Sequence, residues 1–234
     1  MGAPFVLVHG AWHGGTCWRP LVEELERRGE RVVAPDLPCE DHDAGLDDYA
    51  QAVVDAAAVF DEPVVVVGHS LAGLTIPLIP SRRPVVGLVY VAALVPQPGE
   101  VAGSGFAADG LADGFPELAA QQVAADDGSS RWPREAAIAA FYHDVPEPLV
   151  TEAVGLLRTQ HWRPVQEVWP ADALPDVPSR YVACDDDRIV NPVWQRRIAS
   201  DLLGVEPEVL PGSHSPMLSR PAALADLLQK PFDT

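Results

Sequence analysis

The chain has 234 residues, of which 47% are hydrophobic and 21% are charged, so it can bury a core and is not a disordered segment. Its 34 acidic and 16 basic residues give a formal charge of −18, which would repel nucleic acid and anionic membrane surfaces. Cys17, Cys39 and Cys184 are too widely spaced for a disulfide framework, and we expect free thiols. The first residues do not read as a signal peptide, and no apolar run approaches the ~20 residues of a membrane span. The sequence therefore predicts a soluble cytoplasmic protein.

Short valine-rich runs alternate with amphipathic segments along most of the chain. Most runs lack polar alternation, which is typical of strands covered on both faces. This order predicts an α/β protein with a mainly parallel sheet of about six strands flanked by helices. The expected strands cover residues 5–8, 31–34, 64–67, 85–91, 180–184 and 206–210. The expected helices cover residues 18–28, 46–60, 72–80, 193–203 and 222–229, and Gly29 should end the first.

The alternation stops between residues 96 and 178. This stretch is rich in Ala, Gly, Pro and acidic residues and contains no convincing strand. Its aromatic residues favour a packed, mostly helical insertion over a poorly ordered excursion. We therefore expect a core of residues 1–95 and 179–234, with residues 96–178 forming a helical cap.

The strongest functional signal is the sequence VVVVGHSLAG at residues 64–73. A serine with a small residue two places away on each side, between a buried strand and a helix, is typical of a nucleophile elbow. The turn would hold the Ser70 hydroxyl above the sheet, with the amides of the helix behind it. Ala72 stands where a glycine is more usual. The alternative is an ordinary strand-to-helix turn that contains a serine.

A nucleophilic serine needs a general base and an acid that orients the base, and in this architecture they follow the serine in the order acid, histidine. His214 follows the last expected strand, at the sheet edge where ligands bind in open α/β sheets. One of Asp185, Asp186 and Asp187 should accept the imidazole N–H, and spacing does not choose among them. Three consecutive acids could instead bind a metal, but adjacent side chains point in different directions and no second ligand cluster accompanies them. We expect no metal.

We expect the other histidines to be structural or exposed to solvent rather than catalytic. His69 should turn into the protein beside Ser70, whereas His42, His143 and His161 fall in loops or in the expected cap.

The first strand runs into the glycine-rich sequence HGAWHGG at residues 9–15. Such a loop can direct a backbone N–H at an acyl oxygen that becomes negative. The backbone amides of Ala11 and Leu71 are the candidates for this oxyanion hole. The loop lacks the Lys-Ser/Thr pair and the spaced glycines of nucleotide sites, so no nucleotide or other cofactor is expected.

Taken together, these blocks resemble the α/β-hydrolase fold superfamily, and within it the branch of small esterases and hydroxynitrile lyases that includes plant methyl-ester esterases and bacterial esterases. Residues 5–15 with Cys17 and Trp18, residues 68–73 and residues 214–221 carry the likeness, which is weak between 96 and 178. The branch's Cys-x-x-Asp pattern matches residues 184–187, which favours Asp187 as the acid. Its lyases have a Lys after the catalytic His and a Thr in the oxyanion loop. Ser215 and Ala11 stand at those positions, so the resemblance favours hydrolysis.

The sequence thus predicts a serine carboxyl-ester hydrolase that cleaves a small, mostly hydrophobic ester through Ser70, His214 and Asp187. The alternatives are a lyase, a C–C hydrolase or a cofactor-free oxygenase on the same fold, and a non-catalytic ligand-binding protein. A homodimer is compatible with the sequence. Core packing accounts equally well for the side chains expected to line the substrate pocket. These are Trp12, Leu71, Phe106, Tyr142, Trp162 and Met217.

Overall fold

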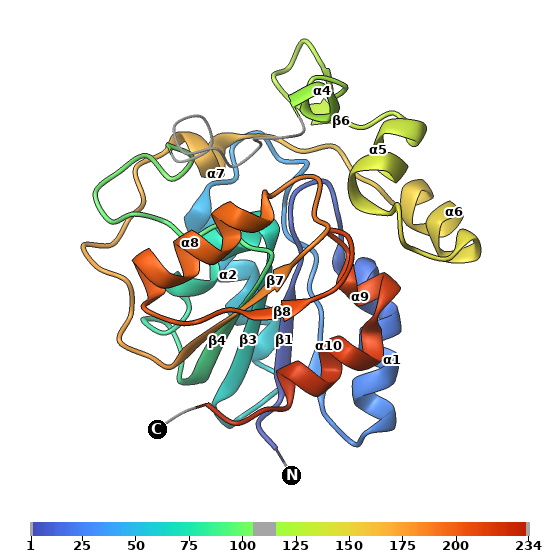
Figure 1. The fold of residues 1–234 in the computed structure, drawn as a ribbon. Coiled ribbons are helices and arrows are strands. Elements are labelled where there is room, and N and C mark those ends of the chain that lie inside the picture. Colours follow the sequence, from blue (N-terminus) through green and yellow to red (C-terminus); the bar gives the residue numbers. More distant parts are fainter. Residues whose placement is uncertain (1, 105–115, 233–234) are drawn as a thin grey trace.

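The computed structural model describes residues 2–104 and 116–232 (Figure 1). Its centre is a six-stranded sheet in the order β2-β1-β3-β4-β7-β8, and the pairs of neighbouring strands are parallel. The inner strands are buried along most of their length, as continuous apolar runs indicate. The predicted fold class is confirmed. The strands are β1 (Phe5–Val8), β2 (Val32–Val33), β3 (Val64–His69), β4 (Val85–Val91), β7 (Ser179–Cys184) and β8 (Glu208–Leu210).

Helices cover the sheet on both sides (Figure 1). On one side, α1 (Arg19–Arg27) packs beside α9 (Pro216–Ser219) and α10 (Pro221–Leu228), so the two ends of the chain meet there. On the other side lie α2 (Leu46–Ala57) and α8 (Pro192–Leu203). No helix in the described ranges is long and apolar enough to span a bilayer.

The chain after β3 departs from the prediction. The expected helix over residues 72–80 is wrong, because the chain forms two 3₁₀ helices, η2 (Ser70–Leu74) and η3 (Ile76–Leu78). Pro77 explains the interruption, since an α-helix would need an N–H at that position and has no room there for a proline ring. Gly73 lies directly against the loop after β4, where an added Cβ would be only 1.8 Å from Leu94 O. This contact fixes η2 against the sheet.

The stretch between β4 and β7, residues 96–178, is here named the inserted segment. Its helices lie beyond the carboxyl ends of the strands, and they alternate with irregular stretches (Figure 1). It also contains the antiparallel strands β5 (Val123–Ala124) and β6 (Ser130–Arg131), which the sequence analysis did not predict. Two residues are too few to show a periodicity. The helices are α4 (Pro116–Ala119), α5 (Arg134–Phe141), α6 (Glu147–Gly155) and α7 (Arg163–Gln166).

Candidate active site

Ser70 occupies a strained turn where β3 runs into η2. Its φ angle is 53°, in the left-handed region that costs a non-glycine residue about 1–2 kcal/mol. Small residues are needed around the turn: a Cβ on Gly68 would lie 2.8 Å from Ile76 Cγ2, and Ala72 is fully buried. Ser70 itself is half-buried, whereas the residues of β3 before it are buried. A nucleophile elbow requires a turn of this kind.

The glycine-rich loop after β1 touches the same serine. A Cβ added to Gly10 would lie 2.7 Å from Ser70 Cβ and 3.1 Å from His69 Nδ1, so the loop approaches as closely as backbone can. Ala11 follows directly in this loop. Leu71 is the second residue of η2, where the first amides of a helix have no acceptor within the helix. Of the two predicted oxyanion amides, that of Ala11 therefore lies near Ser70 in space, and that of Leu71 follows Ser70 directly in the chain.

His214 and Asp187 form a buried pair at the carboxyl ends of β8 and β7. His214 Nδ1 lies 2.7 Å from Asp187 Oδ2, and both side chains are almost fully inaccessible to solvent. A carboxylate only accepts, so Nδ1 carries the hydrogen, and in the neutral form of the imidazole Nε2 keeps its lone pair. The other oxygen of Asp187 accepts hydrogen bonds from the backbone amides of Ile189, at 2.8 Å, and Val190, at 2.9 Å.

The three consecutive acids, which spacing alone left equivalent, have different partners in the structure. Asp185 Oδ1 accepts a hydrogen bond from the Gly212 amide at 3.0 Å. Asp186 is exposed and pairs with His143. The two neighbours of Asp187 thus have partners other than His214, and Asp187 is the member of the row that contacts the imidazole.

Gln195 is a contributor that the sequence analysis missed. Its side chain is completely buried, and its Nε2 donates to Asp187 Oδ2 at 2.9 Å and to Val190 O at 2.7 Å. Its Oε1 accepts from the Cys184 amide at 3.0 Å. Gln195 therefore connects the end of β7 to the carboxylate. A single glutamine in an amphipathic helix gives no signal for this role.

Three more histidines are buried around the site. His69 turns into the protein, as predicted: its Nε2 donates to the backbone carbonyl of His214 at 2.7 Å, and the two rings lie 4.5 Å apart. Burial lowers the pKa of His9 and of His13 to about 4, and that of His69 well below the ordinary value. At neutral pH these three imidazoles are uncharged.

The cysteines are free thiols, as predicted. Burial raises the pKa of the Cys39 thiol to about 11 and keeps the pKa of the Cys17 and Cys184 thiols above the ordinary range. None of the three is therefore an activated thiolate at neutral pH.

The side chains expected to line the substrate pocket differ in how far they are buried. Trp12, Tyr142 and Met217 are buried and Trp162 is half-buried, while Phe106 lies outside the described residues. The rings of Trp12 and Trp162 contact each other at a centroid distance of 5.1 Å.

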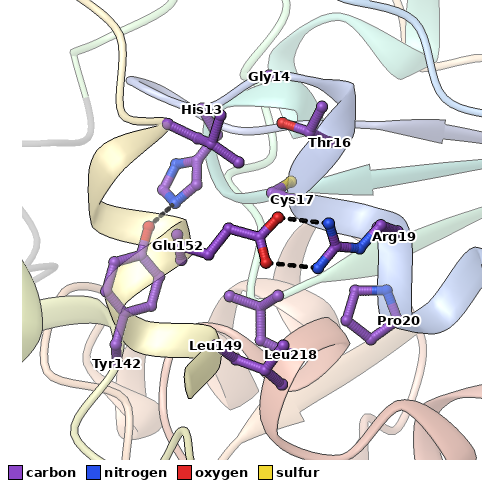
Figure 2. A pocket seen from close by; sticks show the side chains of 12 residues that line it. His13, Gly14, Thr16, Cys17, Arg19, Pro20, Tyr142, Leu149, Glu152 and Leu218 are labelled. Carbon is purple, nitrogen blue, oxygen red and sulfur yellow. Dashed lines mark hydrogen bonds and ion pairs between the residues drawn. The ribbon is translucent and has the colours of Figure 1, made fainter. Parts of the chain in front are cut away.

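Figure 2 shows the small pocket that Tyr142 lines, between the start of α1 and α6. The Arg19–Glu152 ion pair crosses it. Its volume of about 20 Å³ would hold one water molecule, not an ester substrate.

Comparison with known proteins agrees with this geometry. Residues 5–227 match the alpha/beta hydrolase family. A pyrethroid hydrolase from Sphingobium wenxiniae is 29% identical over 95% of this chain and 85% of that protein. Methyl jasmonate esterase 1 from Vitis vinifera is 28% identical over 97% of this chain and 95% of that protein. The crystal structure of a pyrethroid hydrolase superposes with a TM-score of 0.84 at 27% identity, covering 97% of this chain and 95% of that one. The predicted resemblance to plant and bacterial esterases is confirmed, and the chain belongs to the alpha/beta hydrolase family.

Proposed function

We propose that this ester-cleaving hydrolase is a serine carboxylesterase with Ser70 as nucleophile, His214 as general base and Asp187 as the acid that orients the base. The observation that carries the proposal is the 2.7 Å contact between His214 Nδ1 and Asp187. It leaves the lone pair on Nε2 available to accept a proton, as the mechanism of a serine esterase requires. The strained turn at Ser70 adds support, because strain of this kind is concentrated at functional sites.

In the proposed mechanism, Ser70 Oγ forms a bond to the ester carbonyl carbon while its proton passes to His214 Nε2. The carbonyl oxygen becomes negative and is stabilised by the amides of Ala11 and Leu71. When the tetrahedral intermediate collapses, the carbon–oxygen bond to the alcohol breaks and the alcohol leaves with the proton from His214. Water then attacks the acyl-enzyme with His214 again as base, and the acid is released.

For the substrate, we propose a small, mostly hydrophobic ester, bound with the inserted segment acting as a cap. The aromatic contact between Trp12 of the oxyanion loop and Trp162 of the inserted segment supports an apolar surface near the site. The relatives named for hydrolysis of pyrethroids and of methyl jasmonate support the same class. The net charge of −18 disfavours strongly anionic substrates.

The proposal is tested by the hydrolysis of p-nitrophenyl esters of increasing acyl length, comparing the wild type with Ser70→Ala. We expect turnover by the wild type and a fall in kcat/KM on the order of 10⁴ to 10⁶ in the variant. Equal rates for the two proteins would refute the role of Ser70. Consumption of oxygen, or release of an aldehyde and cyanide from a cyanohydrin, would instead indicate one of the alternative reactions.

A further inference from the structure

The peptide between Ala11 and Trp12 is held at both of its polar atoms. Ala11 O accepts a hydrogen bond from His13 Nδ1 at 2.7 Å, and the Trp12 amide donates to Gln160 Oε1 at 3.3 Å. Trp12 has a φ angle of 61°, a left-handed conformation that a bulky side chain rarely adopts. Because this conformation is unfavourable in isolation, the loop keeps it only while contacts from outside hold it.

Those contacts come from the inserted segment. Besides Gln160, the Arg158 amide donates to Trp12 O at 2.7 Å, and the Trp12 indole donates to Ser130 Oγ at 3.0 Å. His13 is linked to the same segment, since its Nε2 lies 2.7 Å from the Tyr142 hydroxyl at the end of α5 (Figure 2). The conformation of the loop beside Ser70 is therefore set by residues that follow it by more than a hundred positions.

The hydrogen bonds define one tautomer of His13. A carbonyl oxygen only accepts, so Nδ1 carries the hydrogen that is donated to Ala11 O. Nε2 must then be an acceptor, and the Tyr142 hydroxyl is its donor. Burial keeps His13 uncharged, with a pKa of about 4, and raises the pKa of Tyr142 well above its ordinary value, so the hydroxyl keeps its proton. The pair thus stays in this arrangement over the neutral range.

We propose that His13 is a positioning residue that holds the Ala11–Trp12 peptide, and that Tyr142 of the inserted segment fixes the His13 tautomer, so that the Ala11 N–H faces the reacting carbonyl oxygen. The inference rests on the proposed function, because it assigns a purpose to the oxyanion loop. The Ala11 N–H belongs to the preceding Gly10–Ala11 peptide, so the His13 bond acts on it through the Ala11 backbone. Without that bond, Ala11 can change φ and ψ together as Trp12 leaves the left-handed region, and the change in φ turns the Ala11 N–H away from Ser70. His13 itself acts only through the backbone.

Two polar substitutions at one position test the proposal. His13→Asn places its amide nitrogen where Nδ1 stood and keeps the donor to Ala11 O, whereas His13→Gln carries its amide one bond further, toward Tyr142. Removing an oxyanion donor outright lowers kcat by about 10²–10³. For a misplaced donor, we expect His13→Gln to lower kcat by roughly 10- to 100-fold with KM changed less than about twofold. His13→Asn should keep at least about a third of the wild-type kcat on the same reasoning.

A trifluoromethyl ketone, whose hemiketal oxygen mimics the oxyanion, gives a second readout. Its inhibition constant should rise in His13→Gln in proportion to the loss of kcat/KM. Leu149→Ala, which changes another side chain lining the same pocket (Figure 2), controls for loss of packing. It should lower thermal stability and leave both kinetic readouts near wild type. Equal kcat values for His13→Asn and His13→Gln would overturn the proposal.

Amide hydrogen exchange separates this proposal from the esterase assignment. The Trp12 amide should exchange faster in His13→Gln than in His13→Asn, whether or not any ester is turned over. Absence of wild-type turnover would refute the proposed function while the exchange measurement still tests the loop. Unchanged Trp12 exchange in His13→Gln would refute the positioning role even in an active esterase. If His13→Gln does not fold, Tyr142→Phe replaces it, and its Trp12 amide should exchange faster than that of the wild type. A Trp12 exchange rate equal to or slower than that of the wild type would refute the positioning role.

Discussion

Mild acid should destabilise the folded chain through its buried histidines. His9 and His13 have a pKa of about 4 in the folded protein, lowered by burial, against an ordinary value of 6.5. Between these two values the unfolded chain binds more protons than the folded one. The free energy of unfolding therefore falls as the pH is lowered through 6.5 toward 4, and this contribution levels off below about 4. At pH 7 and above it is almost fully present.

The size of the effect follows from the two pKa values. At pH 5 an unfolded histidine is almost entirely protonated, whereas a folded one with a pKa of about 4 is about one-tenth protonated. This difference lowers the free energy of unfolding by about 2 kcal/mol for each histidine, or about 4 kcal/mol for His9 and His13 together. His69, whose pKa burial lowers further, adds to the loss. A domain stable by about 5–15 kcal/mol would lose a large part of its stability.

Urea unfolding at pH 7, 6 and 5 measures this loss. His13→Asn removes one buried imidazole, so its free energy of unfolding should fall by about 2 kcal/mol less than that of the wild type between pH 7 and pH 5. His42→Asn is the matched control, because the His42 side chain is 72% exposed, and its pH dependence should equal that of the wild type. If the wild type and His13→Asn lost the same free energy over this range, the description of His13 as a buried, uncharged imidazole would be wrong.

Three other substitutions have defined outcomes. Ser70→Gly should abolish ester hydrolysis and raise the free energy of unfolding by about 1 kcal/mol, because glycine relieves the positive φ; a lower thermal midpoint would contradict this. Gly73→Ala should destabilise the fold by about 3 kcal/mol or more, since its Cβ would lie 1.8 Å from Leu94 O, and a wild-type urea midpoint would count against the contact. Gln195→Met should lower kcat about tenfold and the stability by about 1–3 kcal/mol, because Asp187 loses a donor; an unchanged kcat would show that the carboxylate needs no help from Gln195.

The elements with strong local patterns were predictable. β1, β3 and β4 are continuous apolar runs between turns, and such runs have few alternatives to a buried strand. The small residues around Ser70 likewise predict a tight turn, because their spacing depends only on neighbouring backbone. The local pattern gave a wrong prediction at residues 72–80. The apolar pattern of a helix continues there, but Pro77 prevents the hydrogen bonding of an α-helix.

Contacts between distant segments were not predictable. The sequence marks Tyr142 and Trp12 only as aromatic side chains, which can line a substrate pocket or fill a core. In the structure the Tyr142 hydroxyl faces His13 and the Trp12 indole faces Ser130, partners separated by more than a hundred residues in each case. The choice among three consecutive aspartates had the same difficulty. It depends on how the turn after β7 meets the loop after β8, so spacing left it open and only the resemblance to known esterases favoured Asp187.

The proposed catalytic groups are held by two different parts of the chain. Asp187 and His214 are fixed by hydrogen bonds at the end of the sheet and from Gln195 of α8, and among the described residues the inserted segment donates no hydrogen bond to the carboxylate. Phe141 of the inserted segment only packs against the His214 ring, at a centroid distance of 5.9 Å. The glycine-rich loop after β1, in contrast, is held by hydrogen bonds between Trp12 or His13 and residues of the inserted segment. Changes in the inserted segment should therefore weaken stabilisation of the oxyanion while the base keeps its orientation. If the inserted segment encloses the substrate and directs the Ala11 amide as proposed, variation of this segment for a new ester would alter the rate as well as the fit of the substrate.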